Sequence, residues 1–211
     1  SNLKGLFEGG VKNTEKLSSS FGDELYGDDG DDVIFGGNGG DTIEGGANDD
    51  IIFGGMGPDT IYGDSGVDII FGDVGFFDAA DDKANAVNGD GGEADTIYGG
   101  TGIDLIFGGG GGDLIYGDDG VANDGDADTI FGNSGPDRIH GDGGDDWIYG
   151  NAEGDQLYGD AGDDAIDGGA GGDLVKGGDD DDVITATKGN DFLDGQEGSD
   201  NYLTLNQGGS T

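Results

Sequence analysis

The amino-acid sequence predicts an all-β repeat fold, a solenoid of short strands separated by glycine-rich turns. Three observations predict it: a nine-residue period, an aspartate at the sixth position of each unit, and an apolar residue at the eighth. Writing the chain in nines from Gly27 gives GDDGDDVIF, GGNGGDTIE, GGANDDIIF, GGMGPDTIY and GDSGVDIIF. A fixed period of this length is the signature of an architecture in which each unit packs against its neighbours.

The sixth position is aspartate in 18 units counted along the chain. These residues are Asp23, Asp32, Asp41, Asp50, Asp59, Asp68, Asp95, Asp104, Asp113, Asp128, Asp137, Asp146, Asp155, Asp164, Asp173, Asp182, Asp191 and Asp200. Positions 7 to 9 are expected to form a three-residue strand with position 8 facing inwards, because side chains alternate along a strand. Positions 1 to 6 are expected to form the turn, where glycine permits positive φ.

The composition excludes several classes of partner. The 211 residues include 53 glycines, 48 acidic and 7 basic residues, and the formal net charge is −41. Nucleic acid is not an expected partner, because phosphate binding needs clustered Lys and Arg. No apolar run reaches the roughly 18 residues of a spanning helix, so no membrane insertion is expected. The absence of cysteine excludes disulfides and thiolate metal sites. Hard dications, which prefer carboxylate and carbonyl oxygen, are the natural counterions.

The units resemble the G-G-x-G-x-D-x-U-x nonapeptide of RTX (repeats-in-toxin, hemolysin-type) calcium-binding proteins, over about residues 18–203. The resemblance implies a calcium-stabilised parallel β-roll, a β-solenoid with 18 residues per coil and about nine coils. It implies calcium ions between successive turns, held by the position-6 carboxylates and by position-1 backbone carbonyls. Those carbonyls belong to Gly27, Gly36, Gly45, Gly54, Gly63, Gly72, Gly99, Gly108, Gly117, Gly132, Gly141, Gly150, Gly159, Gly168 and Gly177. On the order of 10–16 ions are expected from ligand number and strand spacing.

An alternation at position 9 independently supports the 18-residue coil. Odd-numbered units carry Tyr26, Tyr62, Tyr98, Tyr116 and Tyr158, and even-numbered units carry Phe35, Phe53, Phe71, Phe107 and Phe131. Two sheets of different character are the simplest cause. The phenylalanine face is explained either by β-propensity on an exposed strand or by a covered surface, since large apolar patches mark interfaces. The second explanation predicts a homo-oligomer that associates through this sheet.

Folding is expected to depend on calcium. Each nine-residue unit contributes one inward apolar side chain, while ordering a glycine-rich backbone is entropically expensive. Stacked aspartates repel one another and oppose folding further. Metal binding is therefore expected to supply the missing free energy.

The repeat defines the expected domain limits. Residues 1–17 are expected to be an N-terminal cap or linker, 18–203 the β-roll, and 204–211 a C-terminal tail. The units are interrupted at 76–94 and 121–127, which are interpreted as loops protruding from opposite sides. Asp124, Asp126 and Asp128 have the D-x-D-x-D spacing of a calcium loop, so either an accessory cation or a plain solvated acidic loop is expected there.

No catalytic constellation is found. The one histidine, His140, excludes an H-E-x-x-H motif and is expected to be a surface residue, and no G-x-S-x-G motif occurs. The resemblance implies a calcium-binding domain of a secreted bacterial protein, exported unfolded by type I secretion and folding in extracellular calcium. The alternatives are a segment of a calcium-dependent adhesin or surface-layer protein, and the non-catalytic tail of a secreted protease, lipase or epimerase.

Overall fold

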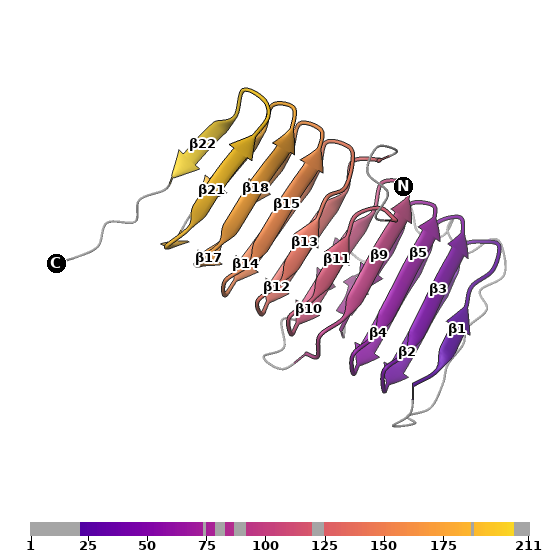
Figure 1. Cartoon of the computed structure of the whole chain (residues 1–211). Coiled ribbons are helices and arrows are strands. Elements are labelled where there is room, and N and C mark those ends of the chain that lie inside the picture. The colour runs from indigo at the N-terminus through magenta and orange to yellow at the C-terminus, as the bar shows by residue number, and fades with distance from the viewer. Residues whose placement is uncertain are drawn as a thin grey trace.

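The computed structural model describes residues 22–73, 75–78, 83–86, 92–119, 125–186 and 188–204. In this part of the chain the regular structure is entirely β, and no helix is long and apolar enough to cross a membrane. The strands follow one another along a single axis, from indigo at the first coil to yellow at the last (Figure 1). Successive strands alternate between two parallel sheets, so the expected β-solenoid is confirmed.

One sheet carries the tyrosine units and is called the tyrosine sheet. Its nine strands are, in spatial order, β1 (Glu24–Tyr26), β3 (Thr42–Ala47), β5 (Thr60–Ser65), β9 (Thr96–Thr101), β11 (Leu114–Tyr116), β13 (Arg138–His140), β15 (Gln156–Ala161), β18 (Leu174–Asp179) and β21 (Phe192–Gln196).

The other sheet carries the phenylalanine units and is called the phenylalanine sheet. Its main path is β2 (Val33–Asn38), β4 (Ile51–Met56), β6 (Ile69–Phe71), β10 (Leu105–Gly110), β12 (Thr129–Ser134), β14 (Trp147–Ala152), β16 (Ala165–Asp167), β19 (Val183–Ala186) and β22 (Asn201–Thr204). Two short strands, β17 (Ala170–Gly171) and β20 (Lys188–Gly189), pair beside it.

The register confirms a coil of 18 residues. Within uninterrupted stretches each residue pairs with the one 18 positions later, as Val33 does with Ile51. Across the first interruption Thr60 pairs with Thr96, and across the second Leu105 pairs with Thr129. The two sheets therefore continue past both interruptions in register and without a change of face.

The first interruption contains secondary structure of its own. Strands β7 (Gly75–Asp78) and β8 (Lys83–Ala86) pair antiparallel, with Phe77 opposite Ala84, and belong to neither large sheet. A loop was expected here, and the Phe-Phe pair of β7 supplies the β-propensity that favours a hairpin instead. The expected cap at 1–17 lies outside the described residues.

The core is a column of position-8 side chains from both sheets, as expected. Its members are buried at 8 % exposure or less: Leu25, Ile34, Ile43, Ile52, Ile61, Ile70, Ile97, Ile106, Ile115, Ile130, Ile139, Ile148, Leu157, Ile166, Val175 and Ile184. The column weakens at the C-terminal end, where Leu193 is only partly buried and Tyr202 is 49 % exposed. One large aliphatic side chain per nine residues makes the core one residue thick along each strand.

Many strands are longer than the three residues expected. Strand β2 continues from position 7 through position 3 of the next unit, because Gly37 stays in register with Gly55. Both glycines have positive φ, 110° and 117°. Several position-2 residues that are not glycine also lie in the left-handed region, such as Asp64 at 71° and Asn151 at 74°, because short polar residues tolerate that conformation best.

Position 9 forms an aromatic column on the outside of each sheet. The rings of Phe35, Phe53 and Phe71 stack at 4.9 and 4.8 Å between centroids, and the column continues to Phe107 and Phe131. The middle of this column is buried within the single chain: Phe71 is 1 % exposed and Phe53 and Phe107 are 9 %. Phe35, at the end, is 43 % exposed. The chain itself therefore covers most of the apolar face that the sequence presents.

Candidate metal centres

The position-6 aspartates lie at the ends of the turns, immediately before the strands. Their backbone is fixed by the sheet, since the Asp32 carbonyl accepts a hydrogen bond of 2.9 Å from the Ile51 N–H of the next coil. Their side chains are fixed by one another: Asp50 Oδ1 accepts the Asp32 backbone N–H at 2.8 Å. The same bond crosses an interruption, from the Asp59 N–H to Asp95 Oδ1 at 2.8 Å.

This bond links the aspartates into two continuous ladders, one for each set of turns. One ladder runs through Asp23, Asp41, Asp59, Asp95, Asp113, Asp137, Asp155, Asp173 and Asp191. The other runs through Asp32, Asp50, Asp68, Asp104, Asp128, Asp146, Asp164, Asp182 and Asp200. All 18 aspartates singled out in the sequence are thus brought together.

The second carboxylate oxygen of the ladder residues has no hydrogen-bond partner. Fifteen ladder aspartates combine a buried side chain with an unpartnered Oδ2 among the described residues: Asp32, Asp41, Asp50, Asp59, Asp68, Asp95, Asp104, Asp113, Asp128, Asp137, Asp146, Asp155, Asp164, Asp173 and Asp182. Leaving a buried polar atom unsatisfied costs about 1–3 kcal/mol, and more when it is charged. Buried oxygen atoms that repeatedly lack a hydrogen-bond partner indicate a site where a ligand or an ion binds.

A backbone carbonyl faces the same space as each orphaned oxygen except that of Asp173. A Cβ placed on Gly45 would stand 2.7 Å from Asp50 Oδ2 and 2.7 Å from the Gly63 carbonyl oxygen of the next coil. On Gly108 the corresponding contacts are 2.5 Å to Asp113 Oδ2 and 2.9 Å to the carbonyl of the following coil. The space is open only because position 1 is glycine.

The same cradle is built along both sets of turns. The carbonyls that face it belong to Gly45, Gly54, Gly63, Gly72, Gly99, Gly108, Gly117, Gly132, Gly141, Gly150, Gly159, Gly168, Gly177 and Gly195. Sequence analysis missed Gly195, although the phase of the repeat places it at position 1. For Gly27 and Gly36, the position-1 residue of the preceding coil lies outside the described residues.

Burial raises the pKa values of many ladder carboxyls, Asp146 and Asp68 among them. Desolvation is the first cause of a pKa raised to about 9 for Asp146 and to about 8 for Asp68, and neighbouring ladder carboxyls add to the rise. The backbone N–H bond to each carboxylate acts in the opposite direction. A divalent cation beside these oxygens removes the cause of the shift, because it stabilises the ionised form. The donor set of carboxylate and carbonyl oxygen fits Ca²⁺.

Position 2 holds acidic residues that sequence analysis did not single out. Asp118 is 4 % exposed and Asp142 is 5 % exposed, and the Gly143 N–H donates to Asp118 Oδ2 at 3.3 Å. Asp128, one of the three residues with calcium-loop spacing, belongs instead to a ladder. Asp124, the first of the three, lies outside the described residues.

His140 lies at an outward position 9, as expected of a surface residue, but its side chain is partly covered. Its side chain is 15 % exposed and its ring stacks between Tyr116 and Tyr158 at centroid distances of 5.1 and 4.5 Å. Position 9 faces outwards, but the aromatic column covers both faces of the imidazole. Stacked neighbours therefore shield most of this outward-facing side chain from water, which its sequence position alone does not indicate.

Comparison with known families is consistent with this geometry. A family model described as HemolysinCabind, RTX calcium-binding nonapeptide repeat (4 copies), matches residues 19–52, 26–60, 44–76, 88–121, 123–157, 141–175 and 176–204. No curated protein matches the chain. The matched segments contain every aspartate of both ladders.

Proposed function

Because the chain belongs to the family of RTX calcium-binding nonapeptide repeats, whose turns bind multiple calcium ions, we propose that it folds when calcium fills both ladders. The observation that carries the proposal is the orphaned, buried Oδ2 of the interior ladder aspartates. Without a cation an interior coil, such as the one that holds Asp146 and Asp155, buries two carboxyl groups with raised pKa values. With a cation the same groups become ligands, so binding free energy becomes folding free energy.

The ligands of each ion are a position-6 Oδ2 and the position-1 carbonyl that faces it in the next coil, together with further oxygens of the turns. Asp50 with the Gly63 carbonyl is one such pair. The partly exposed aspartates of the terminal coils, Asp23, Asp191 and Asp200, bind more weakly because their carboxylates are better hydrated. The fifteen buried carboxylates support a count within the expected range of about 10–16 ions.

The biological setting of the proposal is a secreted bacterial protein. RTX repeats are typical of secreted proteins, and the family resemblance implies export of an unfolded chain through a type I secretion channel. The chain then folds in extracellular calcium. The β-roll is the structural, non-catalytic part of such a protein, and the alternatives of an adhesin or surface-layer segment, or of an enzyme tail, differ only in what is attached to it.

A calcium titration followed by circular dichroism tests the proposal. The chain is first stripped with a chelator, and calcium is then added back, with magnesium in a parallel series. We expect a cooperative gain of β signal with calcium and little with magnesium, since Mg²⁺ demands a smaller octahedral site and dehydrates reluctantly. A chain that keeps its full β signal in chelator would refute calcium-dependent folding.

Self-association through the phenylalanine sheet is also proposed, limited to the part of its outer face that the single chain leaves exposed. Phe35 at 43 % and Trp147 at 56 % exposure supply apolar surface at two places along that sheet. Sedimentation velocity at high micromolar concentration in saturating calcium tests the contact. We expect a species larger than the monomer that Phe35→Ser weakens, and a monomer throughout the concentration series refutes it.

A further inference from the structure

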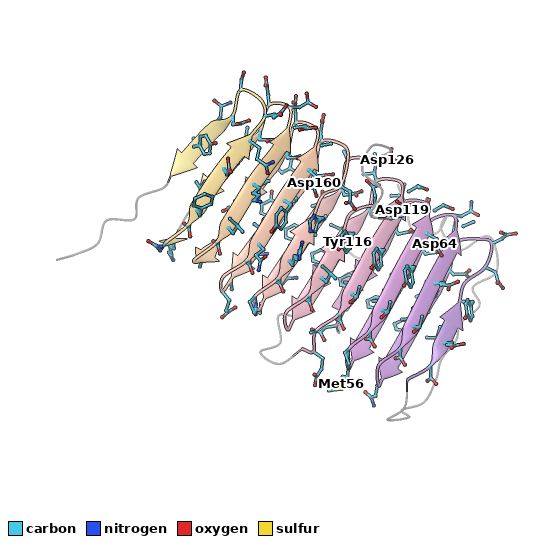
Figure 2. The ribbon with its side chains drawn as sticks, viewed as in Figure 1. Met56, Asp64, Tyr116, Asp119, Asp126 and Asp160 are labelled. Atoms are coloured by element: carbon cyan, nitrogen blue, oxygen red, sulfur yellow. The ribbon has the colours of Figure 1, made fainter. Side chains whose placement is uncertain are left out.

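Three potential metal ligands converge at one edge of the tyrosine sheet, outside both aspartate ladders. They are His140 at the end of β13, Asp142 two residues later, and Asp160 in the adjacent strand β15. One donor atom from each lies within 4.8 Å of the other two, and His140 Nδ1 is 2.8 Å from Asp160 Oδ2. Figure 2 shows Asp160 at the same edge of the roll as Asp64, with Met56 at the opposite edge.

The imidazole is held in place before any ligand arrives. Tyr116 and Tyr158 stack on its two faces with interplanar angles of 12° and 4°, so the ring is confined to one plane. Tyrosine fills the neighbouring places in this column, and a tyrosine ring stacks without offering a nitrogen. An imidazole ring can stack in this column as a tyrosine ring does, and it can also ligate a metal.

The carboxylates supply the charge. Asp142 is 5 % exposed although it is ionisable, and it lies close enough to the buried Asp118 to raise the pKa of that carboxyl. Asp160 is 36 % exposed in its side chain and leaves one side of the cluster open to solvent. A neutral imidazole with two carboxylates is a donor set for a divalent transition metal, whereas the ladders offer oxygen alone.

We propose that His140, Asp142 and Asp160 bind a divalent transition-metal ion, with Zn²⁺ as the representative, at a site separate from the calcium ladders. Ligands around tetrahedral zinc at about 2.0–2.2 Å stand on the order of 3.5 Å apart. The Nδ1 to Oδ2 contact of 2.8 Å therefore opens by less than 1 Å, and the other separations, at most 4.8 Å, close by about 1.3 Å or less. The bound ion ties the turn after β13 to the adjacent strand β15.

Metal binding requires one existing hydrogen bond to His140 to break. Arg138 Nε lies 3.2 Å from His140 Nε2 and donates to it, which places the imidazole proton on Nδ1. Metal binding at Nδ1 moves that proton to Nε2, which then donates to water, and the Arg138 side chain turns away. Arg138 is exposed, and its guanidinium also lies over the Tyr158 ring at 5.5 Å from the centroid, a contact that can persist when the bond to His140 is released. Arg138→Gln is expected to tighten zinc binding for this reason.

The test exploits the fact that His140 is the single histidine of the chain. The calcium-saturated protein is titrated with Zn²⁺ while the imidazole signals are followed by NMR and the heat of binding by calorimetry. Saturating calcium occupies the oxygen sites, so the imidazole reports this cluster alone. We expect the imidazole signals to change up to one equivalent of zinc and not beyond it.

His140→Tyr is the decisive variant, because it installs the residue used elsewhere in the same column and preserves stacking. We expect it to fold in calcium and to lose the tight equivalent of zinc, by roughly tenfold or more in Kd. Asp160→Asn is a second variant that keeps the imidazole signal and is expected to weaken zinc binding by a similar factor. Asp64→Asn is the matched control, since Asp64 occupies position 2 of another coil beside Tyr62 and Tyr98, and it should bind zinc like the parent chain.

Two results overturn the proposal. One is an imidazole spectrum that one equivalent of zinc does not move in the calcium-loaded protein. The other is His140→Tyr or Asp160→Asn binding zinc as tightly as the parent chain. Because every measurement is made on protein whose β signal in calcium has been recorded first, a failure here is distinguishable from a failure of calcium-dependent folding.

Discussion

Asp146→Asn separates the two roles assigned to a ladder carboxylate. The side chain is 0 % exposed, Oδ1 accepts the Asp128 N–H at 2.8 Å, and Oδ2 is unpartnered. Asparagine keeps the shape and the Oδ1 acceptor but replaces Oδ2 by an uncharged amide. The substitution should therefore stabilise the calcium-free fold and destabilise the calcium-bound fold, so that one change shifts the two stabilities in opposite directions.

The magnitude follows from the pKa of the buried group. Folding raises the pKa of Asp146 from 3.8 to about 9, so at pH 7 the calcium-free fold takes up a proton that the unfolded chain does not hold. The gap between 3.8 and 7 costs about 4 kcal/mol. The asparagine amide leaves its own buried donors unsatisfied at about 1–3 kcal/mol. The net gain for the calcium-free fold is then on the order of 1–3 kcal/mol.

The assay measures folding by circular dichroism in two series. In chelator, a stabilising osmolyte drives folding, and Asp146→Asn should need less osmolyte than the parent chain. In the calcium series the same variant should need a higher calcium concentration, by a factor of roughly ten, because a charged ligand has been lost. Asp145→Asn is the matched control, with the same charge change at an exposed neighbour. A variant that folds at lower calcium than the parent contradicts the assignment of Asp146 as a ligand.

Three further predictions concern pH, the glycine cradle and the core. In chelator the fold should be most stable at or below about pH 4, and it should lose stability from there up to the raised pKa values, about 6 for Asp113 and about 9 for Asp146. With calcium, acidification should instead release the ion, and a pH-independent calcium midpoint between pH 5 and 8 would argue against buried ligands. Gly108→Ala should raise the calcium midpoint several-fold because its Cβ enters the cradle. Gly172→Ala should leave the midpoint unchanged, because the added Cβ would make an ordinary van der Waals contact of 3.6 Å with the Asn190 carbonyl oxygen; equal midpoints for the two variants exclude the cradle. Ile106→Ala should destabilise the calcium-loaded fold by about 2–5 kcal/mol in denaturant unfolding, and a loss below about 1 kcal/mol would show that the core column is not close-packed.

Much of the architecture follows from the period alone. A repeat of nine with Asp at position 6 and an aliphatic residue at position 8 places Ile43 and Ile52 inwards and Asp41 and Asp50 at the turns, and the structure has them so. The alternation of Tyr and Phe predicted two sheets, because residues of the same strand position stack every second unit. These features are local and recur in every unit, so an atypical residue in one unit does not change the prediction made from the others.

Strand length and outer burial were not predictable in the same way. Strand β2 reaches Asn38 because glycines at positions 1 and 2 let neighbouring coils approach, which is a property of two coils together. Phe71 is buried at 1 % exposure on a face that alternation assigns to the outside. Burial of an outward side chain depends on what the rest of the chain lays over it, and no nine-residue pattern contains that information.

What the sequence by itself determined is the set of proposed ligands and the size of the coil, because both depend on residue type and spacing. What only the tertiary structure decided is how each carboxylate is used. Contacts between residues 18, 24 or 36 positions apart assign Oδ1 of a ladder aspartate to the preceding coil's N–H and leave Oδ2 orphaned. The same long-range packing places His140 between two tyrosines and beside Asp160, since stacking brings neighbouring coils to about 5 Å whatever their separation along the chain.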